Sequence, residues 1–325
     1  MKAILHDAPE GLRIAEVADP RPGPAEVLIN IAATALNRAD LLQVAGKYPV
    51  PVGANPLLGL EMAGTVMEVG NKVTEFEVGD NVCALLDGGG YAQLVTVPQD
   101  RLLRLPTNLS FTKAAAIPEA WLTAYQALHW IAQLKAGETV LIHAGASGVG
   151  SAAIQLVRLA GAVPIVTASG PKHEGCTQLG AAYCIDYRAE NFAEAILAHT
   201  EGRGVDVLLD FIGGSYLEDN LKSLAVDGRM VMLGFLGGVH AKAMSLAPIL
   251  RKRLKISGTT LRARSADYKA RLTADFARDA WPAFADRRLL PVIDSIYDWN
   301  EVQSAHDYMR ANANFGKIVM TVSED

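Results

Sequence analysis

The chain has 325 residues, half of them hydrophobic, with 30 basic and 35 acidic side chains and a net charge of −5. This composition excludes a disordered chain, and the length exceeds what one hydrophobic core usually supports, so we expect two domains. No apolar run reaches the ~18 residues that span a bilayer, and the charged residues Lys2, Asp7 and Glu10 stand where a signal peptide needs an apolar block. We therefore expect a cytoplasmic protein with no membrane partner.

Residue counts disfavour two further classes of protein: those held by disulfides or cysteine-bound zinc, and those that bind nucleic acid. The three cysteines, Cys83, Cys176 and Cys184, are too few and too scattered for a disulfide framework or a four-cysteine zinc site. The sequence also has no extended Lys/Arg block of the kind that neutralises phosphate backbones. Nucleic acid is therefore not an expected partner.

The first hundred residues show the short alternating patterns of β-strands. Such runs occupy Val27–Ala33, Glu61–Val69 and Tyr91–Val97, separated by turn residues. Near Thr112 the apolar spacing changes to three and four residues, which predicts helices at Lys113–Ala116 and Trp121–Ile131. A mostly β lobe is therefore followed by helical sequence.

Strands and helices then alternate. Apolar runs predict strands at Thr139–Ala144, Val163–Ala168, Val205–Phe211 and Arg229–Phe235, and a helix is predicted at Gly150–Ala160. This order predicts an α/β domain with a doubly wound parallel sheet of the Rossmann type. A long amphipathic helix is predicted at Asp267–Arg288, and the strand-like segment Gly316–Val322 is expected to rejoin the first lobe.

A glycine-rich turn follows the first of these later strands. The segment Thr139–Gly150 reads TVLIHAGASGVG, so Gly145, Ala146, Ser147, Gly148, Val149 and Gly150 join a buried strand to a helix N-terminus. Such a turn presents backbone N–H groups and the positive end of a helix dipole to a pyrophosphate. The middle position of the usual G-x-G-x-x-G is Ser147, whose Cβ narrows the space and whose hydroxyl can donate to a ligand. The alternative is a turn that serves only helix–strand packing.

The end of the second strand indicates which dinucleotide binds. After Ala168 the chain reads Ser169-Gly-Pro-Lys172-His, with no acidic residue before Glu174 to hold a ribose 2′-hydroxyl. Ser169 can hydrogen-bond a 2′-phosphate and Lys172 can neutralise it, so we predict NADPH. Lys172 as a solvated surface lysine is the alternative. Tyr187 is expected near the adenosine end, with an ordinary half-buried tyrosine as its alternative.

Five stretches of the chain resemble a known family. Ala35–Leu42, Leu58–Gly64, Ala114–Tyr125, His143–Gly150 and Phe315–Val319 are similar to landmarks of the medium-chain dehydrogenase/reductases, and within them of the quinone oxidoreductases. The serine-containing turn and residues 117–123 are most similar to the tumour-suppressor-inducible branch of that group. The resemblance implies a GroES-like lobe at residues 1–121 and 265–325, a Rossmann lobe at 122–264, NADPH in the cleft between them, and a homodimer formed through the Rossmann sheets.

The sequence departs from the zinc alcohol dehydrogenases of the same superfamily. Asn37, Leu60 and the segment Ala114–Pro118 stand near the three positions where those enzymes carry Cys, His and Cys ligands. Because these residues offer neither thiolate nor imidazole, we predict that no zinc is bound. The expected reaction is therefore hydride transfer to a quinone or another conjugated small-molecule acceptor, which depends on positioning more than on a Lewis acid.

The resemblance also implies roles for residues near the nicotinamide. Asn37 and Tyr48 would hydrogen-bond the acceptor or the ribose, with a structural or cofactor-orienting role as the alternative for both. Tyr48 as a general acid is disfavoured by an ordinary pKa near 10. Thr123 resembles the threonine beside the nicotinamide, and its alternative is a hydrogen bond back to a helix carbonyl.

Three further segments are assigned to the cofactor by resemblance. Gly234, Phe235 and Leu236 would approach the nicotinamide with backbone groups, unless the glycines of that loop serve only the turn. Leu261 and Arg262 would touch the carboxamide side, although Arg262 can also be a surface arginine. Lys317 resembles a basic residue that closes over the phosphate, with a solvated strand lysine as its alternative.

The main hypothesis from the sequence is an NADPH-dependent, zinc-independent quinone reductase. An enoyl or alkenal reductase is the nearest alternative, because the same site serves both reactions. A third possibility is an NADPH-binding protein with negligible turnover, such as a lens crystallin or a redox sensor.

Overall fold

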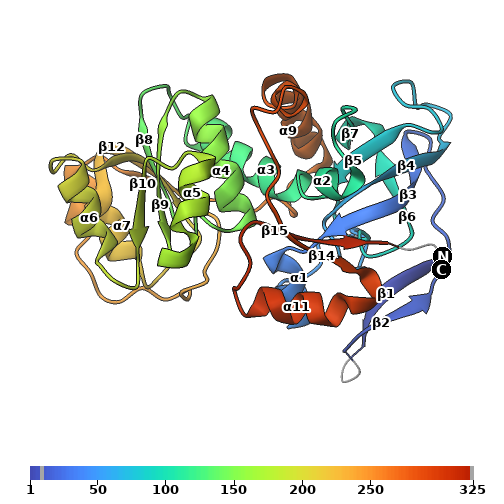
Figure 1. The fold of residues 1–325 in the computed structure, drawn as a ribbon, viewed down its shortest axis with the longest axis horizontal. Coiled ribbons are helices and arrows are strands. Elements are labelled where there is room, and N and C mark those ends of the chain that lie inside the picture. Colours follow the sequence, from blue (N-terminus) through green and yellow to red (C-terminus); the bar gives the residue numbers. More distant parts are fainter. Residues whose placement is uncertain (8–10, 323–325) are drawn as a thin grey trace. The chain divides into compact units, whose positions relative to one another are not determined.

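The computed structural model describes residues 1–7 and 11–322, which form two compact units (Figure 1). The first unit combines the chain up to Leu122 with the chain from Leu261 onward, and the second runs from Thr123 to Thr260. The sequence places these boundaries at 121/122 and 264/265. Within the described ranges, no helix has the length and apolar character needed to cross a membrane.

A seven-stranded sheet forms the centre of the first unit. Its strands follow the order β14-β15-β3-β4-β5-β7, and β6 pairs with β3. The pair β14–β15 is parallel and the other pairings are antiparallel. The strands are β3 (Glu26–Ala35), β4 (Glu61–Val69), β5 (Asn81–Leu85), β6 (Leu94–Pro98), β7 (Leu102–Arg104), β14 (Ile293–Asp298) and β15 (Lys317–Thr321), and β1 (Lys2–Asp7) pairs with β2 (Gly11–Glu16) in a separate ribbon.

Alternation along β3 explains how this sheet builds its core. Val27, Ile29 and Ile31 are buried while the residues between them are partly exposed, as the two-residue period of a strand requires. The C-terminal strand β15 pairs with β3, with Val319 opposite Ala35. The last segment of the chain is therefore an internal strand of the N-terminal sheet.

Helices cover the sheet of the first unit. They are α1 (Arg38–Val44), α2 (Phe111–Ala115), α3 (Pro118–Tyr125), α9 (Ala266–Asp279), α10 (Pro282–Ala285) and α11 (Val302–Arg310), with short 3₁₀ helices η1 (Gln99–Arg101) and η4 (Trp299–Glu301). The single helix expected at Asp267–Arg288 is divided into α9 and α10. Pro282 stands at the start of α10, and a proline cannot continue a preceding helix because it lacks the N–H group. The rings of Trp121 and Phe284 then pack edge to face, 4.7 Å apart.

The second unit is a doubly wound parallel sheet. Its strands follow the order β10-β9-β8-β11-β12-β13, and all pairings are parallel. The strands are β8 (Thr139–Ile142), β9 (Val163–Ala168), β10 (Tyr183–Asp186), β11 (Val205–Asp210), β12 (Leu224–Met232) and β13 (Lys255–Gly258). The strand order reverses beside β8, and ligands of such sheets bind at the carboxyl ends of the strands near this point.

Helices cover both faces of this sheet, as Figure 1 shows. One face carries α4 (Gly148–Leu159) and α5 (His173–Leu179), and the other carries α6 (Phe192–His199), α7 (Leu217–Ser223) and the short α8 (Ala247–Arg251). This arrangement confirms the α/β fold class, with a mostly antiparallel β unit and a doubly wound Rossmann unit. The expected helix Trp121–Ile131 continues from α3 as a π-helix, η2 (Gln126–Ile131), a wider turn than the sequence pattern predicts.

Candidate active site

The glycine turn after β8 is shaped by close contacts with its neighbours. Ala144 has a left-handed backbone with φ of 49°, which ends the strand two residues earlier than expected. A Cβ on Gly145 would lie 2.6 Å from the Cβ of Val166, and a Cβ on Gly150 would lie 2.3 Å from the carbonyl oxygen of Ala144. Both glycines are therefore required by the fold of the turn itself.

Ser147 stands where the usual fingerprint has a glycine, and it caps helix α4. Its backbone is extended, and its hydroxyl oxygen accepts a hydrogen bond from the Gly150 N–H at 3.0 Å. The Ser151 N–H donates to the Ser147 carbonyl oxygen, while the N–H groups of Gly148 and Val149 precede any intrahelical acceptor. The turn therefore fits an anion such as the pyrophosphate of a dinucleotide.

The segment after β9 carries the residues expected at the 2′-phosphate. Ser169 and Lys172 are both partly exposed. Ser169 directly precedes a short 3₁₀ helix, η3 (Gly170–Lys172), and Lys172 is its last residue. Asp186 lies beside them, because β10 pairs with β9 and sets Asp186 opposite Ala168. Its carboxylate accepts hydrogen bonds from the N–H groups of Gly170 and Arg188, both at 2.9 Å. The Arg188 N–H bond is the main cause that holds the pKa of Asp186 below its ordinary value.

Asp186 was missed in the sequence, although the pairing of consecutive strands could have indicated it. The carboxylate brings a negative charge to the segment that carries Lys172. Arg188 adds a second positive charge here, and its guanidinium lies 5.7 Å from the centre of the Tyr187 ring. The Tyr187 side chain is 42% exposed, and its place near the adenosine end of the cofactor stays a prediction.

The loop after β12 is bonded to the loop after β11. The Leu236 N–H donates to the Phe211 carbonyl oxygen and the Gly237 N–H to that of Ile212. Gly234 precedes this pairing, and the side chains of Phe235 and Leu236 are more than half exposed. These contacts make the glycines part of the turn. The predicted backbone contacts of residues 234–236 with a nicotinamide stay a prediction.

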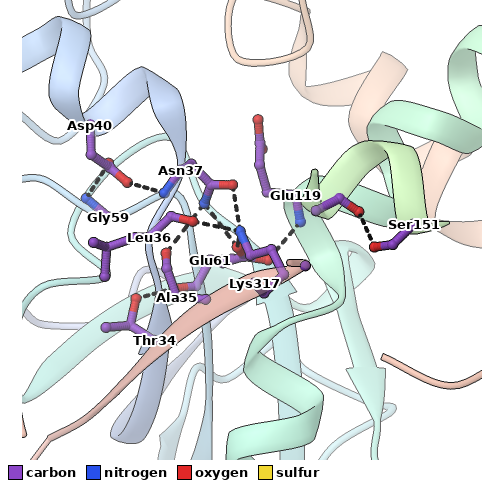
Figure 2. Close-up of polar contacts among 12 residues, drawn as sticks. Thr34, Ala35, Leu36, Asn37, Asp40, Gly59, Glu61, Glu119, Ser151 and Lys317 are labelled. Atoms are coloured by element: carbon purple, nitrogen blue, oxygen red, sulfur yellow. Dashed lines mark hydrogen bonds and ion pairs between the residues drawn. The ribbon is translucent and has the colours of Figure 1, made fainter. Parts of the chain in front are cut away.

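A buried ion pair in the first unit links a strand from the first quarter of the chain to the last strand. The Lys317 ammonium, on β15, lies 2.7 Å from Oε1 of Glu61, the first residue of β4. The same ammonium donates to the Leu36 carbonyl oxygen at 2.7 Å and to Oδ1 of Asn37 at 2.6 Å (Figure 2). These three acceptors use all three N–H groups of the lysine. Lys317 is therefore buried, and all its hydrogen-bond donors have partners inside the protein. Both earlier interpretations, a solvated lysine and a lysine that closes over a phosphate, are contradicted by these contacts.

Asn37 belongs to the same cluster. Its side-chain amide donates to Glu61 Oε1 at 2.8 Å and to the Ala35 carbonyl oxygen at 3.2 Å, and its Oδ1 accepts from Lys317. Both amide N–H groups are thus engaged inside the protein. The contacts favour the structural role over a direct hydrogen bond from the Asn37 amide to an acceptor.

Asp40 adds a second buried carboxyl close by. It accepts hydrogen bonds from the N–H groups of Asn37 and Gly59 and from the Tyr91 hydroxyl. Burial raises the pKa of Asp40 to about 6, although the bonds from Asn37 and Gly59 act in the opposite direction. Its oxygens are fully used in holding the start of α1 against the segment that contains Gly59.

Glu119 is the third carboxyl of the cluster, and sequence reasoning did not single it out. Its backbone N–H, in the first turn of α3, donates to Glu61 Oε2 at 2.9 Å, so the Glu61 carboxylate caps this helix. Figure 2 shows the Glu119 side chain pointing away from the Glu61–Lys317 pair. Burial, and next the charge of Glu61, raise the pKa of Glu119 to about 8.

Tyr48 and Arg262 lie together in the first unit. The Arg262 guanidinium is 5.6 Å from the centre of the Tyr48 ring, and it donates to the Asp87 carbonyl oxygen and to Oε1 of Gln43. Arg262 is only 3% exposed, so the surface-arginine alternative is wrong, and Leu261 before it is also buried. Burial, and next the charge of Glu119, raise the pKa of Tyr48. The hydroxyl therefore stays protonated and is a hydrogen-bond donor more than an acid.

The positions that bind zinc in related enzymes do not fit a metal here. Leu60 is apolar and buried, and the Asn37 carbonyl already faces the Lys317 ammonium. Among residues 1–7 and 11–322, no group of three or more His, Cys, Asp or Glu side chains is arranged to hold a metal ion. A tetrahedral site with thiolate and imidazole ligands cannot be built from these residues.

Comparisons with known proteins match one family within the first unit and a second family mostly within the second unit. Residues 23–107 match the family described as alcohol dehydrogenase GroES-like domain, and residues 148–278 match the family described as zinc-binding dehydrogenase. The chain therefore has the two domains of the medium-chain dehydrogenase/reductases and belongs to that family.

Similar curated proteins are large synthases of mycobacteria. A mycocerosic acid synthase-like polyketide synthase of Mycobacterium tuberculosis is 34% identical over 303 residues, which are 93% of this chain and 14% of that protein. A phthioceranic/hydroxyphthioceranic acid synthase of Mycobacterium bovis is 41% identical over 214 residues, which are 66% of this chain and 10% of that protein. The chain thus spans about a tenth to a seventh of the length of these relatives.

Solved structures of similar length match nearly the whole chain. The CurK enoyl reductase has a TM-score of 0.87 and 29% identity, covering 99% of both chains. Mycobacterial Rv1454c, solved in complex with NADPH, has a TM-score of 0.87 and 27% identity, covering 99% of this chain and 100% of its own. An NAD-dependent alcohol dehydrogenase has a TM-score of 0.88 and 29% identity over 99% of this chain and 100% of that chain.

Proposed function

We propose that this protein reduces a carbon–carbon double bond conjugated to a carbonyl group, using NADPH. The observation that carries the proposal is the likeness over the whole chain to the CurK enoyl reductase. The JamJ enoyl reductase adds to it, with a TM-score of 0.87 and 27% identity over 99% of both chains. This reaction was the alternative interpretation of the sequence, and it replaces the quinone as the favoured acceptor because none of the similar proteins described here is named for a quinone.

The second unit would hold the cofactor. The helix N-terminus at Gly148 and Val149 would bind the pyrophosphate, with Ser147 fixing the turn. Ser169 and Lys172 would face the 2′-phosphate, where the lysine offsets the charge of Asp186. The NADPH in the similar mycobacterial Rv1454c structure supports this choice over NADH. When bound, the cofactor supplies the hydride of the reduction.

The first unit would hold the substrate carbonyl. Tyr48 keeps its proton because burial raises its pKa, so its hydroxyl can donate a hydrogen bond to the carbonyl oxygen. Arg262 holds the Tyr48 ring by its cation–π contact, and its Nη2 is buried without a partner among the described residues. These two donors would stabilise negative charge that develops on the oxygen during reduction.

A panel of acceptors tests the proposed function. Oxidation of NADPH is followed with enoyl thioesters, alkenals and quinones, and kcat/KM is compared among them. We expect kcat/KM to be at least tenfold higher for an enoyl thioester or an alkenal than for a quinone, which equals about 1.4 kcal/mol of transition-state discrimination. A quinone preferred by that margin would restore the first interpretation, and no turnover with any of them would favour a binding protein.

We further propose that the protein is a homodimer formed through the Rossmann sheet, as its resemblance to the family implies. Strand β13 is at the edge of that sheet, and its residues Lys255, Ile256 and Gly258 are exposed. An exposed edge strand presents unpaired backbone groups to a second copy. Light scattering after gel filtration tests this, with the Ile256→Pro variant expected to be monomeric.

A further inference from the structure

We infer that Glu119 is the acid that delivers the proton of the reduction. The inference deepens the proposed function and rests on it. Reduction of a conjugated double bond adds a hydride to one carbon and a proton to the carbon next to the carbonyl, and the hydride alone leaves an enolate. The chain must therefore place an acid where that carbon is bound.

Among the three carboxyls of the cluster, Glu119 is the one whose side chain is not consumed by internal contacts. Glu61 accepts from Asn37, Lys317 and the Glu119 backbone, and Asp40 accepts from two backbone N–H groups and Tyr91. Glu119 Oε2, in contrast, is shielded from solvent and has no hydrogen-bond partner among the described residues. An ionised carboxylate in that position would be buried without a partner. This costs much more free energy than burying a protonated, neutral carboxyl.

Glu119 lies on the one face of helix α3 that is partly exposed. In α3, Glu119 and Thr123 are partly exposed while the other residues are buried. Because they are four residues apart, the two side chains lie on the same face of the helix. Glu119 is thus on the polar, partly exposed face of α3, with one carboxyl oxygen shielded from solvent, and Figure 2 shows its side chain directed away from the ion pair that fixes the start of the helix.

The charges around Glu119 come from four neighbouring segments. Glu61 on β4 and Asp40 on α1 oppose its ionisation, while Lys317 on β15 and Arg262 favour it. Lys317 is paired with Glu61 at 2.7 Å, so the opposite effects of these two charges on Glu119 partly offset each other. Tyr48 is close enough for the charge of Glu119 to raise its pKa. The acid therefore lies in the same region of the protein as the hydroxyl proposed to hold the carbonyl.

In the proposed step, a proton moves from the Glu119 carboxyl to the enolate carbon. The O–H bond of the Glu119 carboxyl breaks, a C–H bond forms at the enolate carbon, and the electron pair of the O–H bond stays on the carboxylate. Because Glu119 is partly exposed, solvent then returns the proton.

Four proteins test the inference: the wild type and the variants Glu119→Gln, Glu119→Asp and Glu218→Gln. Glu218 is an exposed glutamate of α7 and serves as the matched control. The probe is the crotonyl thioester of N-acetylcysteamine, with kcat measured at saturating NADPH. The dissociation constant for NADPH is measured by fluorescence. Carbon-detected NMR of labelled side-chain carboxyls follows the titration of Glu119 in the protein without cofactor.

We expect Glu119→Gln to lower kcat by about 10²- to 10⁴-fold, as loss of a general acid does. Binding of NADPH should stay within twofold, Glu218→Gln should behave as wild type, and Glu119→Asp should recover part of the rate. The carboxyl signal that Glu119→Gln removes should titrate near pH 8, and the wild-type kcat should fall as pH rises through that value.

The experiment gives different results when the proposed reduction fails and when only the role of Glu119 fails. A wild type that does not reduce the thioester overturns the proposed function and the inference with it. A wild type that reduces it while Glu119→Gln keeps kcat within threefold overturns the inference alone. If the glutamine variant does not fold, a wild-type kcat that is unchanged between pH 6 and 9 overturns it equally.

Discussion

The Lys317 ammonium and the Glu61 carboxylate form an ion pair 2.7 Å long in which both side chains are buried, at 5% and 0% exposure. A lysine from the last strand thus neutralises a glutamate from the fourth. Removing one partner of such a pair leaves a buried charge without compensation, which costs about 3–5 kcal/mol. We expect Lys317→Met to lower the free energy of unfolding by this amount, measured by urea denaturation.

The double variant Glu61→Gln/Lys317→Met removes both charges and is expected to recover more than half of the loss. The matched control is Lys222→Met, because Lys222 is half exposed on α7 and its ion pairs are at the surface. Its effect should stay below about 1 kcal/mol. If Lys317→Met is as mild as this control, the buried pair does not have the role described.

The pKa of Glu119 predicts how stability depends on pH. The folded protein binds this proton more tightly than the unfolded chain, because the pKa rises from 4.5 to about 8 on folding. The stabilisation is therefore complete below pH 4.5 and is lost as pH rises toward 8, by ~1.4 kcal/mol for each unit of the shift. Subtracting the unfolding free energy of Glu119→Gln from that of the wild type should give a difference that falls between pH 5 and 8. A difference that does not vary with pH would mean that Glu119 is ionised in the folded protein.

Two substitutions at Ser147 separate the effect of its helix-capping hydroxyl from the effect of side-chain size. Ser147→Ala removes the hydroxyl that accepts from the Gly150 N–H, and loss of such a cap costs about 0.5–2 kcal/mol of stability. Ser147→Val also adds bulk where a pyrophosphate approaches the turn. We expect both variants to lower the melting temperature but only the valine variant to weaken NADPH binding more than tenfold, about 1.4 kcal/mol. Equal NADPH affinities in both variants would place the ligand farther from the turn.

Lys172 should distinguish the two nicotinamide cofactors. Its charge would contact the 2′-phosphate of NADPH, a group that NADH lacks, and a charge-assisted hydrogen bond contributes about 1.5–3 kcal/mol. Lys172→Ala is therefore expected to raise KM for NADPH at least tenfold and to leave KM for NADH nearly unchanged. Lys222→Ala is the control. Equal changes for both cofactors would contradict the phosphate contact.

Much of the fold could be predicted from the sequence, because the two-residue period of strands and the three- to four-residue period of helices are local patterns. The strands Glu61–Val69 and Val163–Ala168 have the predicted bounds, since their apolar runs end at turn residues. Boundaries set by backbone conformation were missed. Strand β8 ends before the positive φ of Ala144, and the helix after α3 widens into a π-helix, neither of which the apolar pattern indicates.

The site was predicted less completely because its contacts join distant segments. The glycine turn is a local motif and lies at the carboxyl end of β8. Lys317, Glu61 and Asn37 meet only because β15 pairs with β3 beside β4, so their partnership has no signal in the spacing along the chain. Glu119 was overlooked for the same reason, since its pKa is raised by burial in the folded protein and then by carboxyls from two other elements.

Direct detection of the product tests the central proposal most sharply. The protein is incubated with NADPH and crotonyl N-acetylcysteamine in deuterated water, and the product is examined by mass spectrometry. We predict the saturated butyryl thioester carrying one deuterium on the carbon next to the carbonyl. Recovery of unreduced thioester, in a preparation that oxidises NADPH with a quinone, would contradict the account.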